Sequence, residues 1–530
     1  MKRKTLICYI ALLLGGVLAA LPLLSEEIGL FSFLLWIPFC YHIKKGIYRK
    51  AIKPRVAYLR ALFFFQGYFA AAFSFFIAMY PLDFAGLNVP ASVAVILAAV
   101  ILLPLFQASV FAFSIYLLAL AGKRKLFAFP TSFSLFFSSL CVLFFFLQNF
   151  TWMGVPWASP ALALTSSPAL IQSASLFGSF FLTFLILFVN ALLAEAVDFF
   201  RECTDRYAIL CLALAFLLFF SNLSIGAVLI NRQHNAETEI KVALLQGNFP
   251  IKNEKNNRNL LDTYESLAYA AAEEGAQLML WPESVIHHSI ETDNSMQKYL
   301  CDIAKNTNAI QVVGASSLQE DNGELNYYNS LFIIYPDGNI GEEVYHKRRP
   351  VPFGEYLPWP NLFSALIPAL AEINMLSRDI DAGEGTNLFH TPYGDIGALI
   401  CFDSIYPALA RESAKDGAQL LLLSTNDTWF DGSFGKKLHA SHAVLRAVEN
   451  GRSVARAGNT GYSIIINENG IIGATVEPDE SGYTVLSVTL NSRQTLYTTV
   501  GDVFVYTIIG FLVLYPTLHI ICHKRKEKLF

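Results

Sequence analysis

The stretch DIGALICFD, residues 395–403, decides the fold of the C-terminal half of the chain. Residues 395–402 form a short, mostly apolar run that is typical of a buried strand, and Cys401 lies near its C-terminal end. A nearly continuous apolar strand belongs to a sheet that is covered on both faces. The stretch therefore predicts an α/β domain with a thiol at the end of a central strand.

Similar apolar runs alternate with polar helical stretches on both sides of this strand. Helical spacing occurs in residues 257–274 and 294–306. Further strands are predicted at residues 239–247, 277–281, 311–316, 329–336, 417–425 and 452–458, and in a hairpin over 463–476 that turns at Asn469-Gly470. We expect one α/β domain whose sheet is covered by helices on one face and by a second sheet or a partner on the other.

Long apolar runs dominate the rest of the chain. A bilayer core takes roughly 20 helical residues to cross. Charged residues are nearly absent within these runs and gather between them, which excludes buried helices of a large soluble core. We predict eight membrane spans, at about residues 5–24, 27–43, 59–80, 90–120, 131–150, 169–196, 208–230 and 501–522. Pro104 predicts a kink or a tilt in the fourth span.

Basic residues give the orientation, because Lys and Arg of short loops stay on the cytoplasmic side. They gather at residues 2–4, 44–55, 123–125 and 524–528. Seven crossings then place the α/β domain on the exported side. The expected domains are a seven-span domain at 1–232, an exported catalytic domain at 233–495, and a C-terminal span with a cytoplasmic tail at 496–530.

Charge and cysteine usage limit the possible functions. The formal net charge of −4 gives no sign of nucleic-acid binding, and the topology accounts for the basic clusters. Six of the eight cysteines lie in or beside the spans. Only Cys301 and Cys401 fall in the exported domain, where a disulfide between them is the alternative to a reactive thiol.

Three strand ends carry groups that suit acyl transfer. They are Trp281-Pro282-Glu283-Ser284, Tyr345-His346-Lys347-Arg348 and Leu399-Ile400-Cys401-Phe402-Asp403. Catalytic groups of α/β sheets gather at the carboxyl ends of strands, so these ends can converge on one pocket. A thiolate attacks a carbonyl, a carboxylate takes and returns a proton, and an ammonium stabilises the developing oxyanion.

These stretches resemble the Glu-Lys-Cys triad of the nitrilase superfamily, in matching order over about residues 240–490. With seven spans before this domain and one after it, the whole chain resembles the membrane-integrated apolipoprotein N-acyltransferase family. Further matching stretches are residues 245–248, 351–358 and 426–430. The resemblance implies a membrane helical bundle of eight spans joined to a nitrilase-like α-β-β-α sandwich.

The resemblance also implies the roles of the site residues. Cys401 is the expected nucleophile, Glu283 the general base and acid, and Lys347 the oxyanion stabiliser, helped by the backbone N–H of Phe402. Glu355 matches a second family carboxylate that orients Lys347, the alternative being a surface charge. The substrate-binding residues that we expect are Phe353, Tyr356, Phe402, Asp403 and Trp429.

Two features depart from the family pattern and affect the expected substrate preference. Phe402-Asp403 stands where the family usually has Tyr-Glu, and the Trp expected soon after Asn248 is missing from residues 251–255. Residues 350–380 combine prolines with large apolar side chains, and we expect them to form a lid over the site at the bilayer surface.

The implied function is acyl transfer from a membrane phospholipid, through a Cys401 thioester, to the α-amine of a diacylglyceryl-modified cysteine of an apolipoprotein. We expect a monomer without cofactor or metal in a bacterial cytoplasmic (inner) membrane, with the catalytic domain on the periplasmic or outer side. Two alternatives stay open. One is a membrane-tethered amidase for a small carbon–nitrogen substrate, which Phe402-Asp403 favours. The other is an idle scaffold that binds lipoproteins.

Two histidine pairs suggest weaker sites. His439 and His442 have a spacing that metal ligands on a helix can have, but this spacing is more typical of a helix surface or core. His287-His288 follows the Glu283 loop, where a position at the mouth of the site is favoured over a proton relay.

Overall fold

The computed structural model describes residues 2–49, 51–82, 86–127, 129–231, 238–249, 259–321, 323–361 and 379–527. The chain forms two compact units. The helical unit contains residues 1–76, 96–232 and 500–530, and the sandwich unit contains residues 77–95 and 233–499. All of the described strands lie in the sandwich unit.

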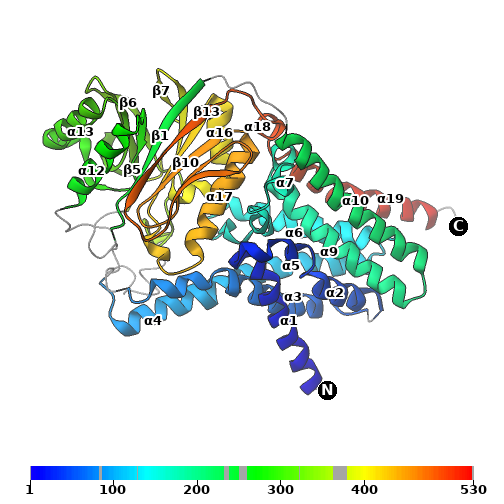
Figure 1. The fold of residues 1–530 in the computed structure, drawn as a ribbon. Helices are drawn as coiled ribbons and strands as arrows, with labels where there is room; N and C mark the ends of the chain where they lie inside the picture. Colours follow the sequence, from blue (N-terminus) through cyan, green and yellow to red (C-terminus); the bar gives the residue numbers. More distant parts are fainter. Residues whose placement is uncertain are drawn as a thin grey trace. The chain divides into compact units, whose positions relative to one another are not determined.

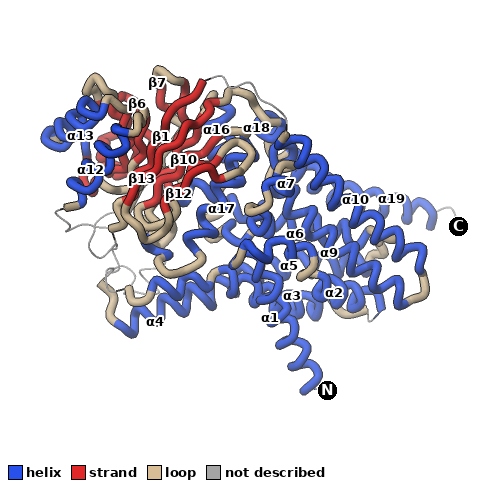
Figure 2. Tube along the Cα trace, in the orientation of Figure 1, coloured by secondary structure: helices blue, strands red, loops and turns tan. Residues whose placement is uncertain are grey.

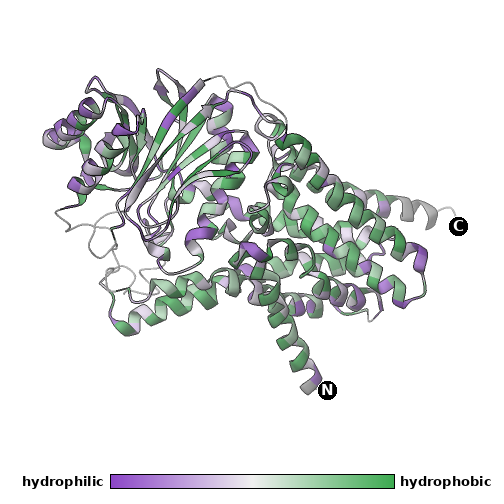
Figure 3. Ribbon diagram, viewed as in Figure 1, coloured by the Kyte–Doolittle hydropathy of each residue, from purple (hydrophilic) through white to green (hydrophobic). Residues whose placement is uncertain are grey.

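Long helices build the helical unit. α1 packs against α3, α3 against α5, and α9 against both α6 and α10. Six helices of the described residues are long and apolar enough to cross a membrane, and Figure 3 shows apolar colour along much of α9 and α10. The long helices of this unit are α1 (Lys2–Leu24), α2 (Ile37–Arg49), α3 (Pro54–Ala72), α5 (Leu103–Lys123), α6 (Ser132–Leu147), α9 (Ser179–Arg201), α10 (Asp205–Ile230) and α19 (Val503–Glu527). All of them except α2 and α3 form all or part of one of the six.

Two of the eight predicted spans, 27–43 and 59–80, are not among these six helices. Residues 27–43 do not form one continuous helix: a 3-10 helix, η1 (Glu26–Phe33), is followed by α2 of only 13 residues. Asn190 of α9 stabilises the break, because its side chain accepts from Trp36 N and donates to Ser32 O. A buried side chain thus satisfies backbone groups that a continuous helix would pair internally.

The fourth predicted span is irregular near Pro104, as expected. α4 (Val89–Leu97) and α5 are joined by a π-helical turn, η4 (Ala98–Leu102). Proline has no N–H to donate, and its ring crowds the carbonyl four residues earlier. A π turn at that point accommodates both effects.

The sandwich unit has two mixed sheets. The first has the order β13-β1-β2-β4-β5-β6, with β3 beside β4, and the second has the order β12-β11-β10-β9-β8-β7. Figure 2 shows the strands gathered in this unit. The strands of the first sheet are β1 (Thr238–Gln246), β2 (Leu278–Leu280), β3 (Ile286–Ser289), β4 (Ile310–Asp321), β5 (Glu324–Ile334), β6 (Ile340–His346) and β13 (Gly482–Leu490). Those of the second are β7 (Phe389–Thr391), β8 (Gly394–Ile400), β9 (Leu420–Thr425), β10 (Ser453–Gly458), β11 (Ser463–Ile466) and β12 (Ile472–Val476).

The two sheets face each other and helices cover their outer faces (Figure 1). One apolar core, which includes Val242, Leu280, Ile396 and Leu422, lies between the sheets. A second core packs the first sheet against α12 (Leu260–Glu273) and α13 (Asn294–Thr307). α16 (Pro407–Asp416) and α17 (Gly435–Asn450) pack against β8 and β10 of the second sheet. This is the expected α-β-β-α sandwich.

The predicted strands and helices of this unit are present, with shifted ends. The 463–476 hairpin turns at Gly470, whose φ of 78° suits glycine. β3, β7 and β13 were not predicted. β13 pairs along the whole of β1 and closes one edge of the first sheet, a long-range pairing that no local pattern specifies.

Candidate active site

The ends of four strands that run in one direction within their sheets carry the candidate groups. In the first sheet, β2 pairs with β4 in parallel. β6 also runs parallel to β4, because β5 lies between them and is antiparallel to both. In the second sheet, β8 runs parallel to β9. Ser424 of β9 donates to Trp281 O beyond β2 and so ties the two sheets together at this edge. The chain segments after these strands therefore gather at one place.

Lys347, which follows β6, is only 1% exposed and lies between two carboxylates. Its Nζ is 2.8 Å from Glu283 Oε1 and 2.7 Å from Glu355 Oε1. Burial by itself lowers the pKa of Lys347, but Glu283 and Glu355 outweigh it, and the pKa is raised well above its usual range. Lys347 is thus a fixed, buried cation.

Both oxygens of Glu283 are held. Oε1 accepts from Asn329 Nδ2 at 2.7 Å as well as from Lys347, and Oε2 accepts from the backbone N–H of Asn426 at 2.9 Å. The next residue, Ser284, has a φ of 54°. Gly314 of β4 lets this loop approach, since a Cβ there would lie 2.3 Å from Pro282 O.

Glu355 lies in the turn that follows Lys347. Its Oε2 accepts from Val351 N at 2.7 Å, so the carboxylate is fixed by its own turn while Oε1 faces Lys347. Burial raises the pKa of Glu355, and Lys347 opposes this without cancelling it. The alternative of a solvated surface charge is wrong, because the side chain is 14% exposed and paired.

Cys401 begins the turn after β8 with a φ of 49°, a conformation that non-glycine residues rarely adopt and that often marks functional sites. Burial raises the pKa of its thiol well above the usual range, and the charge of Glu283 adds to this, while Lys347 and a hydrogen bond from Thr425 oppose it. The thiol is therefore protonated at rest and needs a base to become a nucleophile. Glu283 and Lys347 both act on it electrostatically.

Asp403 is fully buried and holds the backbone around the site. Its carboxylate accepts from Ile400 N at 3.1 Å, from Arg349 N at 2.8 Å and from Tyr345 Oη at 2.9 Å. It thereby connects the turn that carries Cys401 to the segment that carries Lys347. Burial raises its pKa, although Lys347 and these donors oppose the rise.

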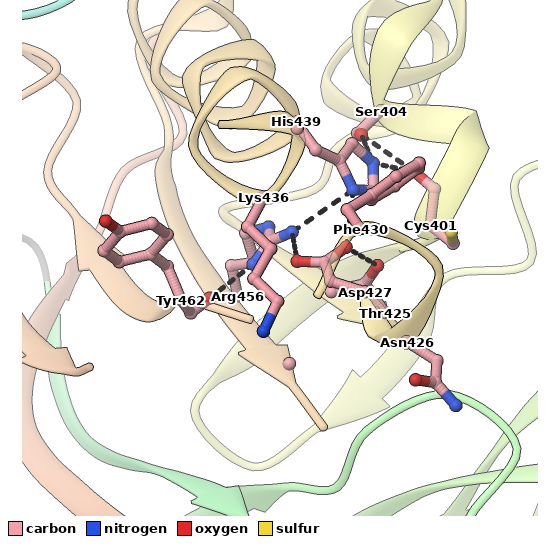
Figure 4. Close-up of polar contacts among 12 residues, drawn as sticks. Cys401, Ser404, Thr425, Asn426, Asp427, Phe430, Lys436, His439, Arg456 and Tyr462 are labelled. Atoms are coloured by element: carbon pink, nitrogen blue, oxygen red, sulfur yellow. Dashed lines mark hydrogen bonds and ion pairs between the residues drawn. The ribbon is translucent and has the colours of Figure 1, made fainter. Parts of the chain in front are cut away.

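A second buried polar cluster lies next to the backbone carbonyl of Cys401 (Figure 4). Asp427 Oδ1 is 2.7 Å from His439 Nδ1, and Asp427 Oδ2 is 2.6 Å from the guanidinium of Arg456. Burial alone would raise the pKa of Asp427, but Arg456 and His439 outweigh it and keep the pKa well below its usual range. His439 Nε2 is 3.2 Å from Cys401 O.

The other predicted site residues occupy different places. Phe402 is buried and its ring packs edge-on against Tyr406 at 5.6 Å between centroids. Phe353 N donates to Tyr356 O in the turn around Glu355, where the Phe353 side chain is exposed. Trp429 is half-buried in the short helix η10 (Thr428–Phe430).

Some sequence features lie outside the described residues. They include residues 251–255, where the expected Trp is missing, and residues 362–378, which make up most of the predicted lid.

The structure separates the sequence-level alternatives. Cys301 and Cys401 are free thiols. In the described ranges, no three His, Cys, Asp or Glu side chains are grouped so that they could hold a metal ion. His288 is about half exposed and pairs with Asp293 at 3.0 Å.

Sequence reasoning missed the polar residues that hold the triad. Asn329 lies within β5 without any local signal, and its role comes only from pairing with its neighbours. Asn426 and Asp427 belong to a stretch that the sequence had marked, and a polar pair directly after a buried strand could have identified them. For His439, a place on the helix surface or in the core was favoured over a metal ligand, and no contact with the nucleophile's backbone was expected.

Two families match consecutive parts of the chain. The carbon-nitrogen hydrolase family matches residues 241–497, and the apolipoprotein N-acyltransferase N-terminal domain matches residues 15–192.

Similar proteins cover nearly the whole length. An apolipoprotein N-acyltransferase of Geobacter metallireducens is 29% identical over 95% of this chain and 93% of its own length. One of Shewanella oneidensis is 26% identical over 97% and 96%, respectively. Among solved structures, an amidase from Nesterenkonia sp. aligns with 51% of this chain and 96% of its own at 19% identity and a TM-score of 0.38.

Proposed function

Because the chain belongs to the apolipoprotein N-acyltransferase family, we propose that it transfers an acyl chain from a membrane phospholipid to the α-amine of the lipid-modified N-terminal cysteine of apolipoproteins. The observation that carries the proposal is the buried Lys347, which lies between Glu283 and Glu355 and acts electrostatically on Cys401. This arrangement supplies the base, the oxyanion stabiliser and the nucleophile that acyl transfer needs.

In the first half-reaction, Glu283 takes the proton of the Cys401 thiol, and the sulfur attacks the ester carbonyl of the phospholipid. The ammonium of Lys347 and the Phe402 N–H stabilise the oxyanion. The carbon–oxygen bond to the glycerol then breaks, and Glu283 returns the proton to the leaving alkoxide. The products are a lysophospholipid and a Cys401 thioester.

In the second half-reaction, the α-amine of the apolipoprotein attacks the thioester and Glu283 takes its proton. The carbon–sulfur bond breaks, and the thiol of Cys401 is restored with that proton. An amide and the free enzyme result, and the two half-reactions share one site in turn, which is the ping-pong order.

The topology is part of the proposal. Eight spans in three domains, 1–232, 233–495 and 496–530, would place the catalytic domain on the periplasmic or outer side of a bacterial inner membrane, in an enzyme that acts as a monomer. The lipid substrates support a membrane location, because each buried methylene holds them in the bilayer by about 0.8 kcal/mol. Phe353, Tyr356 and Trp429 are the proposed acyl-pocket residues, and Asp403 positions the site.

Intact mass measurement tests the proposal. The full-length protein in detergent micelles is mixed with dipalmitoyl phosphatidylethanolamine, which gives a single possible acyl increment. We expect one palmitoyl addition, an equal amount of lysophospholipid, and loss of the addition when a diacylglyceryl-modified peptide amine is added. Cys401→Ala should abolish the addition, and the matched variant Cys301→Ala should keep it.

The opposite outcomes are equally clear. An acyl addition that persists in Cys401→Ala would reject the nucleophile. No addition from phospholipid, together with ammonia release from a short aliphatic amide, would favour the amidase alternative.

A further inference from the structure

The buried cluster of Asp427, His439 and Arg456 takes no part in the proton transfers above, yet it contacts the backbone of the nucleophile (Figure 4). We propose that His439 is a positioning residue that fixes the peptide plane between Cys401 and Phe402, and thereby aims the oxyanion-stabilising N–H of Phe402. The inference rests on the proposed function and adds a residue to it.

Two side chains hold the carbonyl of Cys401: Ser404 of the same turn and His439 of α17. Ser404 Oγ donates to Cys401 O at 2.8 Å, and His439 Nε2 lies 3.2 Å from both Cys401 O and Ser404 Oγ. A carbonyl oxygen only accepts, so the His439 contact requires a proton on Nε2. On the other side of the ring, Nδ1 lies 2.7 Å from Asp427 Oδ1, so the carboxylate fixes the direction in which Nε2 points.

The imidazole has little freedom to turn. His439, Asp427 and Arg456 are all fully buried, and Arg456 is itself held by Asp427 and Tyr462 O. Gly461 allows this packing, because a Cβ at that position would lie 1.9 Å from Asp427 Oδ2. Nε2 is therefore presented to Cys401 O from a rigid support.

The planar peptide bond links the position of the Cys401 carbonyl to the direction of the Phe402 N–H. The peptide unit is planar and trans, so its C=O and N–H point in opposite directions. A carbonyl that is held toward His439 directs the Phe402 N–H away from His439. A flipped plane would instead present the carbonyl oxygen to the oxyanion and repel it.

The conformation of Cys401 explains why an external hold is needed. Its φ of 49° is sparsely populated for a residue with a side chain, and such strain persists only where the surroundings enforce it. α17, the helix of His439, also holds the turn η9 (Cys401–Ile405) at a second point, because Arg446 donates to Ser404 O at 3.2 Å. Arg446 is itself paired with Glu449 at 2.7 Å.

Two substitutions at one position separate positioning from mere packing. His439→Gln places an amide N–H near the location of Nε2 and keeps the donor to Cys401 O, whereas His439→Asn keeps only the donor to Asp427. We expect single-turnover acylation by dipalmitoyl phosphatidylethanolamine to fall about tenfold or less in His439→Gln and about 100-fold in His439→Asn, as when an oxyanion donor is lost. The KM for the phospholipid should not change.

Alkylation of Cys401 by iodoacetamide is the second readout, because it forms no oxyanion. Its rate should stay within about threefold of wild type in both variants. His442→Gln, a change of another buried histidine on α17, is the matched control and should acylate normally.

The outcomes distinguish two failures. Equal acylation by His439→Gln and His439→Asn, or a larger loss in His439→Gln, would overturn the positioning role while the proposed function stands. A wild-type protein that is alkylated at Cys401 but never acylated by phospholipid would overturn the proposed function itself.

Discussion

Lys44 in the helical unit and Lys347 in the sandwich unit are both buried lysines that face two carboxylates. Lys44 Nζ lies 3.4 Å from Glu195 and 3.3 Å from Asp198. Lys347 lies 2.8 Å from Glu283 and 2.7 Å from Glu355. The types of charge are the same, but the elements that supply them differ.

The carboxylates around Lys44 both come from α9, three residues apart, so they face one neighbouring helix, α2. Arg49 of α2 adds a second cation, 2.6 Å from Asp198. Such a cluster ties two helices together. Around Lys347, Glu283 follows β2 and Glu355 lies in the turn after β6, and the three groups meet beside the thiol that follows β8. The comparison shows that the origin of the groups in the fold, rather than their composition, distinguishes a structural cluster from a catalytic one.

The largest effect is expected from Lys347→Met. Loss of the buried ammonium removes the main oxyanion stabiliser, and single-turnover acylation should fall about 10³-fold. Lys347→Arg should restore little, because a planar guanidinium does not fit between two carboxylates placed for a point charge. Acylation within tenfold of wild type in Lys347→Met would place the catalytic cation elsewhere.

Lys44→Met should affect stability and leave chemistry intact. It leaves Glu195 and Asp198 without their shared cation, and one unpaired partner of a buried pair costs about 3 kcal/mol. Thermal unfolding in detergent measures the loss, and a double variant with Glu195→Gln should recover part of it. Slower acylation per folded molecule, with an unchanged unfolding temperature, would contradict the comparison.

Glu355→Gln should give a smaller loss of rate. The amide keeps the contact with Lys347 or with Val351 N but removes the negative charge. A hydrogen bond to a charged group is worth about 1.5–3 kcal/mol. Acylation should therefore slow by roughly tenfold to 100-fold. Glu342→Gln, an exposed change on β6, is the control and should have no effect. Equal acylation rates in Glu355→Gln and Glu342→Gln would show that Glu355 has no role in acylation.

The smallest effect is a shift in pH dependence in Glu283→Gln. The negative charge of Glu283 raises the pKa of Cys401, so a neutral glutamine should lower that pKa and move the alkylation profile of Cys401 to lower pH. Alkylation near neutral pH becomes faster while acylation falls, because the base is lost. A profile that moves to higher pH would show that Glu283 does not act on the thiol.

Local patterns predicted the strand of β8, the thiol at its end and most helix positions. They did not predict Asn329 as a partner of Glu283, because strand pairing brings it there from 46 residues away. The break in residues 27–43 escaped prediction for the same reason, since Asn190 reaches it from a helix far along the chain. The roles of Asp403 and His439 likewise depend on distant backbone atoms that they contact.

By itself, the sequence determined that apolar helices would alternate with short loops, that an α/β domain would follow, and that Glu283, Lys347 and Cys401 would each end a strand, because periodicity and strand-end chemistry are local properties. Only the tertiary structure decided which carboxylates share a lysine, how the thiol is buried, and which side chain holds the Cys401 carbonyl. These depend on the pairing of strands and the packing of two sheets, where burial and distance set the strength of every charge.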